Sequence, residues 1–329
     1  MPVLLVAVMI VAISVGAVNV PLGDVWGIVL HHVTGLGAAS SDPALDQIVW
    51  NFRTPRVVLA ALAGAGLAVT GAVLQTVVAN PLADPLVLGF SYGATLGAVL
   101  VLTLGGGAAV AGLGVSAAAF VGAVAAGALV FVLGRSRGRL APTRLVLAGV
   151  AVGYVFLSAT SYVQLHATPT ELRTVMFWTL GSVAGAQWDQ LPTVTAVVLT
   201  TTVLLTGFGR RLNVLLAGDE SATALGTDVN RLRAVLLVLT ALLTGTIIAV
   251  AGTIGFVGLM IPHLVRLTTG ADHRRLLPLT ALLGAVYLVL VDLLSRTLDR
   301  PEELPLGILT ALLGAPFFLW LLRRDKGLD

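Results

Sequence analysis

The chain has 329 residues, of which 57% are hydrophobic and 11% are charged, and its mean hydropathy is +1.00. One water-soluble core cannot bury that much apolar surface, so the composition predicts a protein that lipid covers. The 19 basic and 16 acidic residues stand in short runs between long uncharged stretches, which excludes a nucleic-acid-binding face. The sequence has no cysteine, which excludes disulfides, thiolate metal sites and a cysteine nucleophile.

Long uncharged stretches predict the membrane spans, because a spanning helix needs about 20 mostly apolar residues. The stretch 86–134 is long enough for two spans with a turn at 105–107, and 234–265 is expected to divide near Thr253, where glycines cluster. The pattern predicts an all-α polytopic membrane protein with about ten transmembrane helices in a single domain, residues 1–329. The stretches are 1–22, 57–79, 86–134, 145–170, 190–209, 234–265, 276–291 and 304–322.

Basic residues between the spans predict the orientation, because cytoplasmic loops carry an excess of Lys and Arg. With ten spans, 14 of the 19 basic residues fall on one side, which we assign to the cytoplasm together with both termini. These are Arg135, Arg137, Arg139, Arg144, Arg210, Arg211, Arg231, Arg233, Arg266, Arg274, Arg275, Arg323, Arg324 and Lys326. The outer side keeps Arg53, Arg56, Arg173, Arg296 and Arg300.

The sequence predicts no ATP-hydrolysing site of its own. A phosphate-binding G-x-x-x-x-G-K-[ST] loop needs a lysine that reaches the phosphates. Lys326, close to the end of the sequence, is the only lysine. An ATP-binding domain with that motif would therefore belong to another polypeptide, and this chain is expected not to be an enzyme.

Two other classes of function stay open at the level of single residues. An ion-coupled carrier keeps ionisable groups in the membrane, and Asp292 is the best candidate, although Arg296 at i+4 is expected to pair with it. An intramembrane serine hydrolase would use Ser91, which stands in a G-x-S-x-G pattern at 89–93, with His263 as a base. That pattern requires a strand-to-helix turn, whereas here it opens a predicted transmembrane helix.

Two polar segments suggest contacts with partner proteins. The cytoplasmic segment 210–233 contains a predicted short helix between Gly218 and Gly226, of a size that a soluble partner can grip; a solvated connector is the alternative. Arg53 and Arg56 stand just ahead of the second predicted span. Arginine suits the bidentate capture of carboxylates on a docking protein, and snorkelling to the membrane interface is the alternative.

In their order along nearly the whole chain, the motifs resemble the FecCD-type permease family of type II ABC importers. The motifs are R-T-P-R at 53–56, G-A-G-L-A at 64–68, L-Q-T at 74–76, N-P-L-A-D-P at 80–85, G-D-E at 218–220 with A-L-G at 224–226, G-F-V-G-L-M-I-P-H-L-V-R at 255–266, D-H-R-R-L-L-P at 272–278, E-L-P-L-G at 303–307 and L-G-A-P-F-F at 313–318.

The resemblance implies a transmembrane permease subunit in a bacterial cytoplasmic membrane, importing an iron-siderophore or a related chelate such as haem or cobalamin. Its implied partners are two ATPase subunits that bind ATP and Mg, an extracytoplasmic substrate-binding protein and a second permease subunit, identical or related; no cofactor or metal is implied for this chain. The implied sites are binding-protein docking at Arg53, Arg56 and Arg296, ATPase coupling at Gly218, Asp219, Glu220, Ala224, Leu225 and Gly226, and a translocation gate at Asn80, Pro81 and Thr143.

Overall fold

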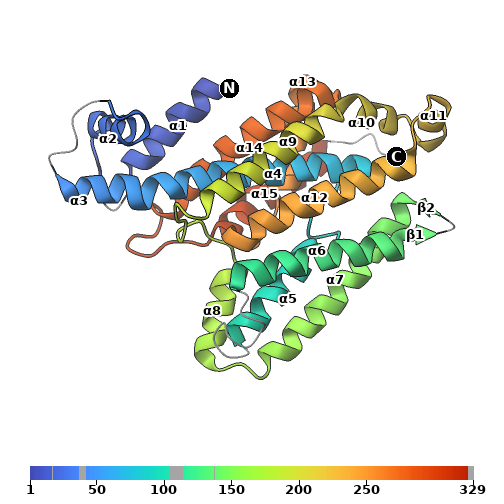
Figure 1. Cartoon of the computed structure of the whole chain (residues 1–329), viewed down its shortest axis with the longest axis horizontal. Helices are drawn as coiled ribbons and strands as arrows, with labels where there is room; N and C mark the ends of the chain where they lie inside the picture. Colours follow the sequence, from blue (N-terminus) through green and yellow to red (C-terminus); the bar gives the residue numbers. More distant parts are fainter. Residues whose placement is uncertain (17, 37–41, 104–113, 137, 325–329) are drawn as a thin grey trace.

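The computed structural model describes residues 1–16, 18–36, 42–103, 114–136 and 138–324, and within these ranges the fold is a helical bundle with one short β-hairpin (Figure 1). The expected turn at 105–107 lies outside the described residues, as do Arg137 and Lys326. The all-α polytopic fold predicted from the sequence is confirmed.

One long helix runs through the centre of the bundle. It comprises α3 (Pro43–Asp46), the π-helical turn η1 (Gln47–Arg53) and α4 (Thr54–Val77), which together form a continuous helix of 35 residues, and its most apolar window is 83% buried. Its neighbours are α9 (Leu191–Gly207), α12 (Val229–Ala251), α13 (Val257–Thr269) and α14 (His273–Ser295). Because protein rather than lipid surrounds it, α4 is the core on which the other helices are arranged.

The central helix begins earlier than the sequence predicts. We expected a loop at 53–56 and a span from residue 57, but the helix continues unbroken through this segment. A proline inside an α-helix removes one backbone hydrogen bond and crowds the preceding turn, and the wider π-turn η1 accommodates Pro55. The hydroxyl of Thr54 donates to the carbonyl oxygen of Val49 at 2.7 Å, which satisfies an acceptor within that turn.

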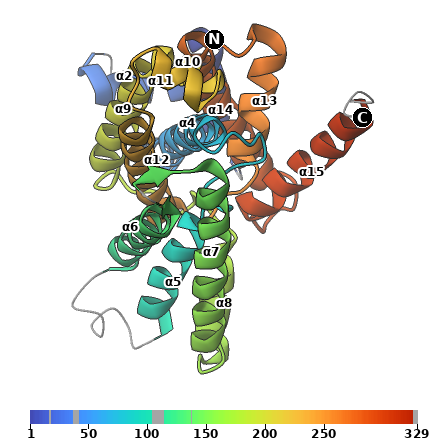
Figure 2. The same ribbon diagram turned by 90° about the vertical axis from the view of Figure 1, so that its right-hand side faces the viewer.

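A second layer packs on one side of this core (Figures 1 and 2). It contains α5 (Phe90–Thr103), α6 (Val115–Gly134), α7 (Pro142–Gln164) and the short α8 (Pro169–Thr179), which the sequence analysis did not predict. The apolar windows of α6 and α7 are each 28% buried, so much of their surface remains for lipid or another chain. A capping box of Thr168 and Glu171 starts α8, and this T-x-x-E signal is visible in the sequence.

Short elements gather at one end of the bundle. The hairpin of β1 (Arg135–Ser136) and β2 (Arg139–Leu140) joins α6 to α7. At the same end, α9 bends by 54° into α10 (Gly209–Leu216), and α11 (Asp219–Ala224) leads into α12. Figure 1 shows the hairpin, α10 and α11 together on the right-hand side.

The expected division of the stretch 234–265 near Thr253 is confirmed. Helix α12 ends at Ala251 and α13 begins at Val257, with five residues of non-helical backbone between them. Gly252 has a φ of +67° and Phe256 a φ of +66°, so two residues with positive φ bound the break between the helices. Non-helical backbone at membrane depth is tolerated where protein or a water-filled cavity covers it.

The predicted first span over residues 1–22 is wrong in its length. Helix α1 (Pro2–Ser14) has 13 residues, its C-cap Val15 is extended, and a separate helix α2 (Leu22–Thr34) starts after Pro21. At about 1.5 Å per residue, α1 spans about two thirds of a 30 Å hydrocarbon layer. Two arginine side chains from distant helices bind the carbonyl groups at its end, as described below.

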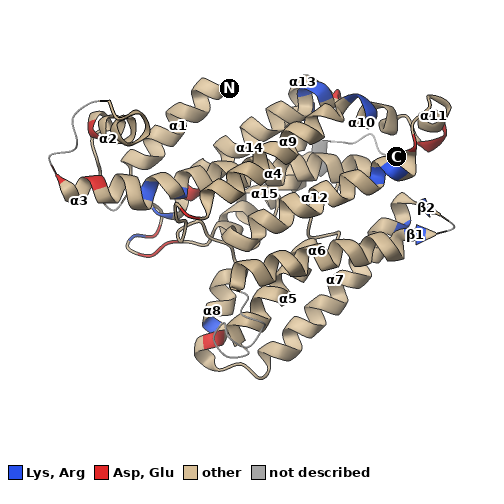
Figure 3. Ribbon diagram, viewed as in Figure 1, with Lys and Arg blue, Asp and Glu red and all other residues tan. Residues whose placement is uncertain are grey.

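By length and composition, five of the described helices can cross a membrane, or six if bent α9–α10 is one span, and α1, α5 and α15 (Leu306–Arg324) add shorter apolar segments. The count of about ten spans remains a prediction. Among the described residues, the basic ones assigned to the cytoplasm gather at one end, around the hairpin, α10 and the end of α13. Figure 3 shows that they are separated from the basic residues beside the start of α4 and in α8.

Candidate functional site

Helix α11 stands between two glycines, as the sequence predicts. Gly218 has a φ of +95° and Gly226 a φ of +79°, conformations that favour glycine, and Asp219 and Glu220 occupy the first turn. Ala222 is fully buried against Leu215 and Val229 and anchors the helix to its neighbours.

The outer surface of α11 is open. Leu225 is 70% exposed, and Leu216, at the end of α10, is 52% exposed. Glu220 and Ala224 are also exposed. Exposed apolar side chains on both sides of a short polar helix, at the basic end of the molecule, form a surface that suits a soluble partner.

Asp219 forms a bidentate ion pair with Arg233, near the start of α12. The Nη1 and Nη2 atoms of Arg233 donate to Oδ2 and Oδ1 of Asp219 at 2.6 and 2.7 Å. The arginine is 2% exposed although the sequence analysis placed it in a cytoplasmic loop. Nothing in the local sequence signalled this burial, because the partners of Arg233 are distant along the chain.

The predicted gate residues lie on two segments at the same end. Asn80 and Pro81 follow the end of α4 in a turn that includes Ala79 at a φ of +48°, and the side chain of Asn80 accepts a hydrogen bond from the Leu82 N–H at 2.9 Å. Thr143 is exposed in the first turn of α7, directly after the hairpin. Their role as a gate remains a prediction.

A second anchor holds α10 at this end. The Asn213 amide donates to Asp272 Oδ1 at 2.6 Å, and its oxygen accepts from the backbone N–H of His273 at 2.8 Å. Asp272 also caps α14 by accepting from the Arg274 N–H. The hydrogen bond from Asn213 and the Arg274 N–H lower the pKa of the Asp272 carboxyl.

The end of the bundle where α4 begins and α14 ends contains a buried ionic cluster formed by Arg56, Asp292, Arg296 and Glu303. Arg56 Nε donates to Asp292 Oδ1 at 2.8 Å, and Arg56 Nη1 donates to Glu303 Oε1 at 2.9 Å. Arg296 Nε lies 3.3 Å from Asp292 Oδ2, which confirms the expected i,i+4 pair. Asp292 is fully buried, whereas the side chain of Glu303 is 43% exposed.

Two arginines of this end bind the carbonyl groups at the end of α1. Arg53 donates to Ile13 O and Ser14 O at 2.8 and 2.9 Å, and Arg296 donates to Ala12 O at 2.6 Å. The last carbonyls of a helix lack partners within the helix, and here two guanidinium groups satisfy them. Gly16 leaves room for Arg53, because a Cβ at this position would collide with the guanidinium.

The three predicted docking arginines are therefore close together and buried. Arg53 and Arg56 are each 8% exposed and Arg296 is 7% exposed, and each binds groups of this chain. Their role in docking remains a prediction. Glu303 could not be predicted as a partner of Arg56 from the sequence, because 247 residues separate the two.

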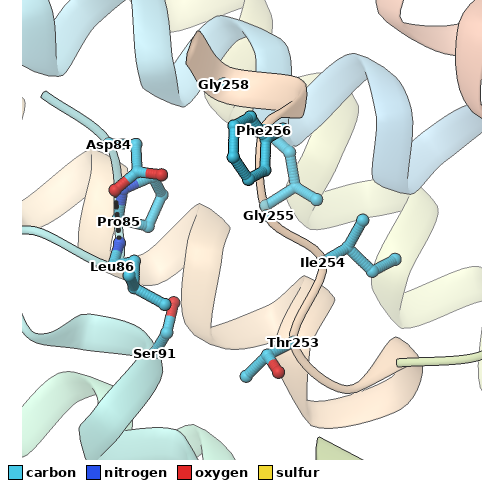
Figure 4. Close-up of a pocket in the computed structure, with 10 residues that line it drawn as sticks. Asp84, Pro85, Leu86, Ser91, Thr253, Ile254, Gly255, Phe256 and Gly258 are labelled. Carbon is cyan, nitrogen blue, oxygen red and sulfur yellow. Dashed lines mark hydrogen bonds between the residues drawn. The ribbon is translucent and has the colours of Figure 1, made fainter. Parts of the chain in front are cut away.

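A small cavity of about 60 Å³ lies beside the break between α12 and α13 (Figure 4). Asp84 and Ser91 line one side, and Thr253 to Phe256 line the other. The Asp84 carboxylate accepts hydrogen bonds from the Leu86 and Val87 N–H groups, both at 2.9 Å, and so fixes the turn ahead of α5.

The geometry around Ser91 does not match a hydrolase. Ser91 follows an irregular loop rather than a strand, and Gly89 has a φ of +77°. His263 is not among the residues that line the cavity; its ring packs against Phe317 and Phe318, with centroids 6.0 and 6.5 Å away. Asp292 is likewise neutralised by two arginines, the arrangement expected of a structural carboxylate rather than an ion-coupling one.

The helical bundle, the exposed helix α11 at its basic end and the buried ionic cluster at its other end together describe a polytopic membrane permease. Comparison with protein-family models matches residues 4–324 to the FecCD transport family. The chain belongs to the FecCD transport family.

Named relatives and a solved structure agree with this assignment. The cobalamin import system permease protein BtuC of Halobacterium salinarum is 44% identical over 84% of this chain and 73% of its own length. The hemin transport system permease protein HmuU of Yersinia pestis is 39% identical over 98% of this chain and 94% of its own length. A solved structure described as an inward-facing conformation of a metal-chelate type ABC transporter superimposes with a TM-score of 0.84 at 32% identity, covering 98% of this chain and 97% of that one.

Proposed function

We propose that the chain is the permease subunit of an ATP-binding-cassette importer that carries a metal chelate, an iron-siderophore, haem or cobalamin, across a bacterial cytoplasmic membrane. The named relatives, which serve cobalamin and haemin, support this substrate class. In this proposal both termini face the cytoplasm, and ATP and Mg bind to two separate ATPase subunits.

The observation that carries the proposal is the geometry of α11. A helix of six residues, with Leu225 70% exposed beside it, presents polar and apolar groups outward at the basic end of the bundle. A short protruding helix of this kind fits a cleft on a soluble ATPase, so we assign ATPase coupling to Gly218–Gly226. ATP-driven closure of the two ATPases would move α11 and, through it, the segments that carry Asn80, Pro81 and Thr143.

The proposed docking point for the substrate-binding protein is the group of three arginines, Arg53, Arg56 and Arg296. Arg53, Arg56 and Arg296 already have partners, so an incoming carboxylate has to replace one of them. Glu303 is the replaceable partner, because its side chain is 43% exposed whereas Asp292 is fully buried. Docking would then exchange one carboxylate on Arg56 for another and keep the guanidinium paired.

A second permease subunit completes the pathway in this proposal. Helix α15 projects away from the bundle (Figure 2), and Leu312 and Leu319 on it are each 64% exposed. Tyr154 and Tyr162 of α7 are 67% and 66% exposed. We place an identical or related chain against these surfaces, with the substrate path between the two subunits.

Mild solubilisation from the native membrane, followed by mass spectrometry of the proteins that co-purify, tests the proposal. Recovery of a soluble ATPase together with a second permease chain is the expected result. Reproducible recovery of this chain without an ATPase, even after crosslinking, would contradict it. Any extracytoplasmic protein recovered can be titrated with haemin, a ferric siderophore and cobalamin to decide among the substrates.

A further inference from the structure

The guanidinium of Arg233 joins three segments that are far apart in the sequence. Besides its two bonds to Asp219, it donates from Nε to the carbonyl oxygen of Val77 at 3.1 Å and from Nη1 to that of Leu140 at 2.9 Å. Four of its five N–H donors are thus used. We propose that Arg233 is the positioning residue through which α11 controls the two segments of the cytoplasmic gate.

Each backbone partner of Arg233 lies just ahead of a predicted gate residue. Val77 is the last residue of α4, three positions before Asn80, and its carbonyl lacks a partner within the helix. Leu140 ends β2, three positions before Thr143. A displacement of Arg233 therefore acts on the start of both gate segments at the same time.

Side chains of α12 bind both the backbone N–H and the backbone carbonyl of Leu140. Its N–H donates to Asn230 Oδ1 at 2.9 Å, and its carbonyl accepts from Arg233. The hairpin therefore follows the start of α12 rather than moving on its own.

Direct packing does not provide this link, because a groove of about 880 Å³ lies between the hairpin and α11. Asp219, Glu220 and Thr223 line one side of the groove, and Arg139 and Leu140 line the other. The Asp219–Arg233 pair bridges the two sides. Since Arg233 is almost completely buried, separating it from Asp219 would leave a buried charge without its counter-charge. The two residues therefore move as a unit.

The inference rests on the proposed function, and it is tested on the complete transporter, reconstituted with its ATPase and binding protein. The variants are Asp219→Asn, Arg233→Lys and the double variant. Arg275→Gln is the matched control, because it removes an exposed positive charge at the same end, outside the segment 210–233. Each of these four variants is made both alone and in combination with Thr143→Cys. The added cysteine gives one thiol per permease chain, because this chain has no other cysteine.

In complexes matched for ATPase content, we expect Asp219→Asn and Arg233→Lys to import about tenfold less substrate per ATP hydrolysed, within the usual range of coupling between sites. The double variant should be no worse than the more impaired single variant, because both act through the same ion pair. In the chain that carries Thr143→Cys alone, maleimide labelling at position 143 should change in rate when ATP binds. When Asp219→Asn or Arg233→Lys is added, this change should be lost.

Unchanged import per ATP in Asp219→Asn, or an ATP-dependent labelling change that persists in both variants, would overturn the inference while leaving the proposed function in place. If Arg233→Lys does not assemble, Asp219→Asn decides, because the Asp219 side chain is 49% exposed and its replacement is isosteric. A wild-type complex that shows no ATP-dependent import would instead overturn the proposed function, and this inference with it.

Discussion

Arg56 and Asp292 are 236 residues apart in the sequence, yet Arg56 Nε donates to the fully buried carboxylate of Asp292 at 2.8 Å. This contact joins the central helix α4 to α14, and Arg296 on the same carboxylate extends the connection to the end of α1. The end of the bundle where α4 begins is therefore held together by charges rather than by apolar packing alone.

Replacing Asp292 should destabilise this end strongly. Asp292→Asn leaves Arg296 without its counter-charge and leaves Arg56 paired only with the half-exposed Glu303. Loss of one partner from a buried ion pair typically costs about 3–5 kcal/mol. Thermal unfolding in detergent measures the effect. The matched control is Asp299→Asn, an exposed carboxyl seven residues further along, which should unfold at the wild-type temperature. Equal stability of the two variants would refute a structural role for Asp292.

Glu303→Gln should strengthen docking of the substrate-binding protein. The change removes the carboxylate that competes for Arg56, and charges at the rim of an interface act mainly on association rate and salt dependence. Surface plasmon resonance with the purified binding protein at two salt concentrations measures both. Glu302→Gln, an exposed neighbour, is the control. Weaker docking of Glu303→Gln than of Glu302→Gln would show that Glu303 itself contributes to the interface.

Leu225→Asp should prevent stable assembly with the ATPase. The side chain is 70% exposed next to α11, so the substitution costs little in the isolated permease but places a charge in the proposed interface. The ratio of ATPase to permease after affinity purification is the measurement. Leu298→Asp, 60% exposed at the opposite end, is the control and should keep the wild-type ratio. A wild-type ratio for Leu225→Asp would exclude this surface.

Gly93→Ala should destabilise the contact between α5 and α6. A Cβ at position 93 would collide with the carbonyl of Gly122 on α6, and overpacking of a tight contact costs about 1–3 kcal/mol. Gly185→Ala is the control, because a Cβ there meets no atom within 4 Å. Thermal unfolding of both variants tests the difference, and identical transitions would contradict close helix packing at Gly93.

Features set by local backbone chemistry were predictable from the sequence. Glycines that require a positive φ marked both the division of α12 from α13 and the two ends of α11, at Gly252, Gly218 and Gly226. Gly93 and Gly97, four residues apart on α5, both lie at the contact with α6, where an added Cβ would collide with the carbonyl of Gly122 or of Ala118.

Features set by distant partners were not predictable. The span over residues 1–22 was expected to be one helix, because no local signal shows that Arg53 and Arg296 bind the carbonyls at the end of α1. Arg233 looked like a loop residue because its partners Val77 and Leu140 lie 156 and 93 residues away. Such burial follows from the tertiary fold, and a single sequence carries no trace of it.

The most direct test of the central claim is uptake into proteoliposomes that hold the permease and its ATPase, with ATP inside and substrate-loaded binding protein outside. Haemin, a ferric siderophore and cobalamin serve as the three probes. We predict accumulation of one of them that requires internal ATP and is unaffected when proton and sodium gradients are collapsed. Uptake that follows an imposed ion gradient without ATP would contradict the account.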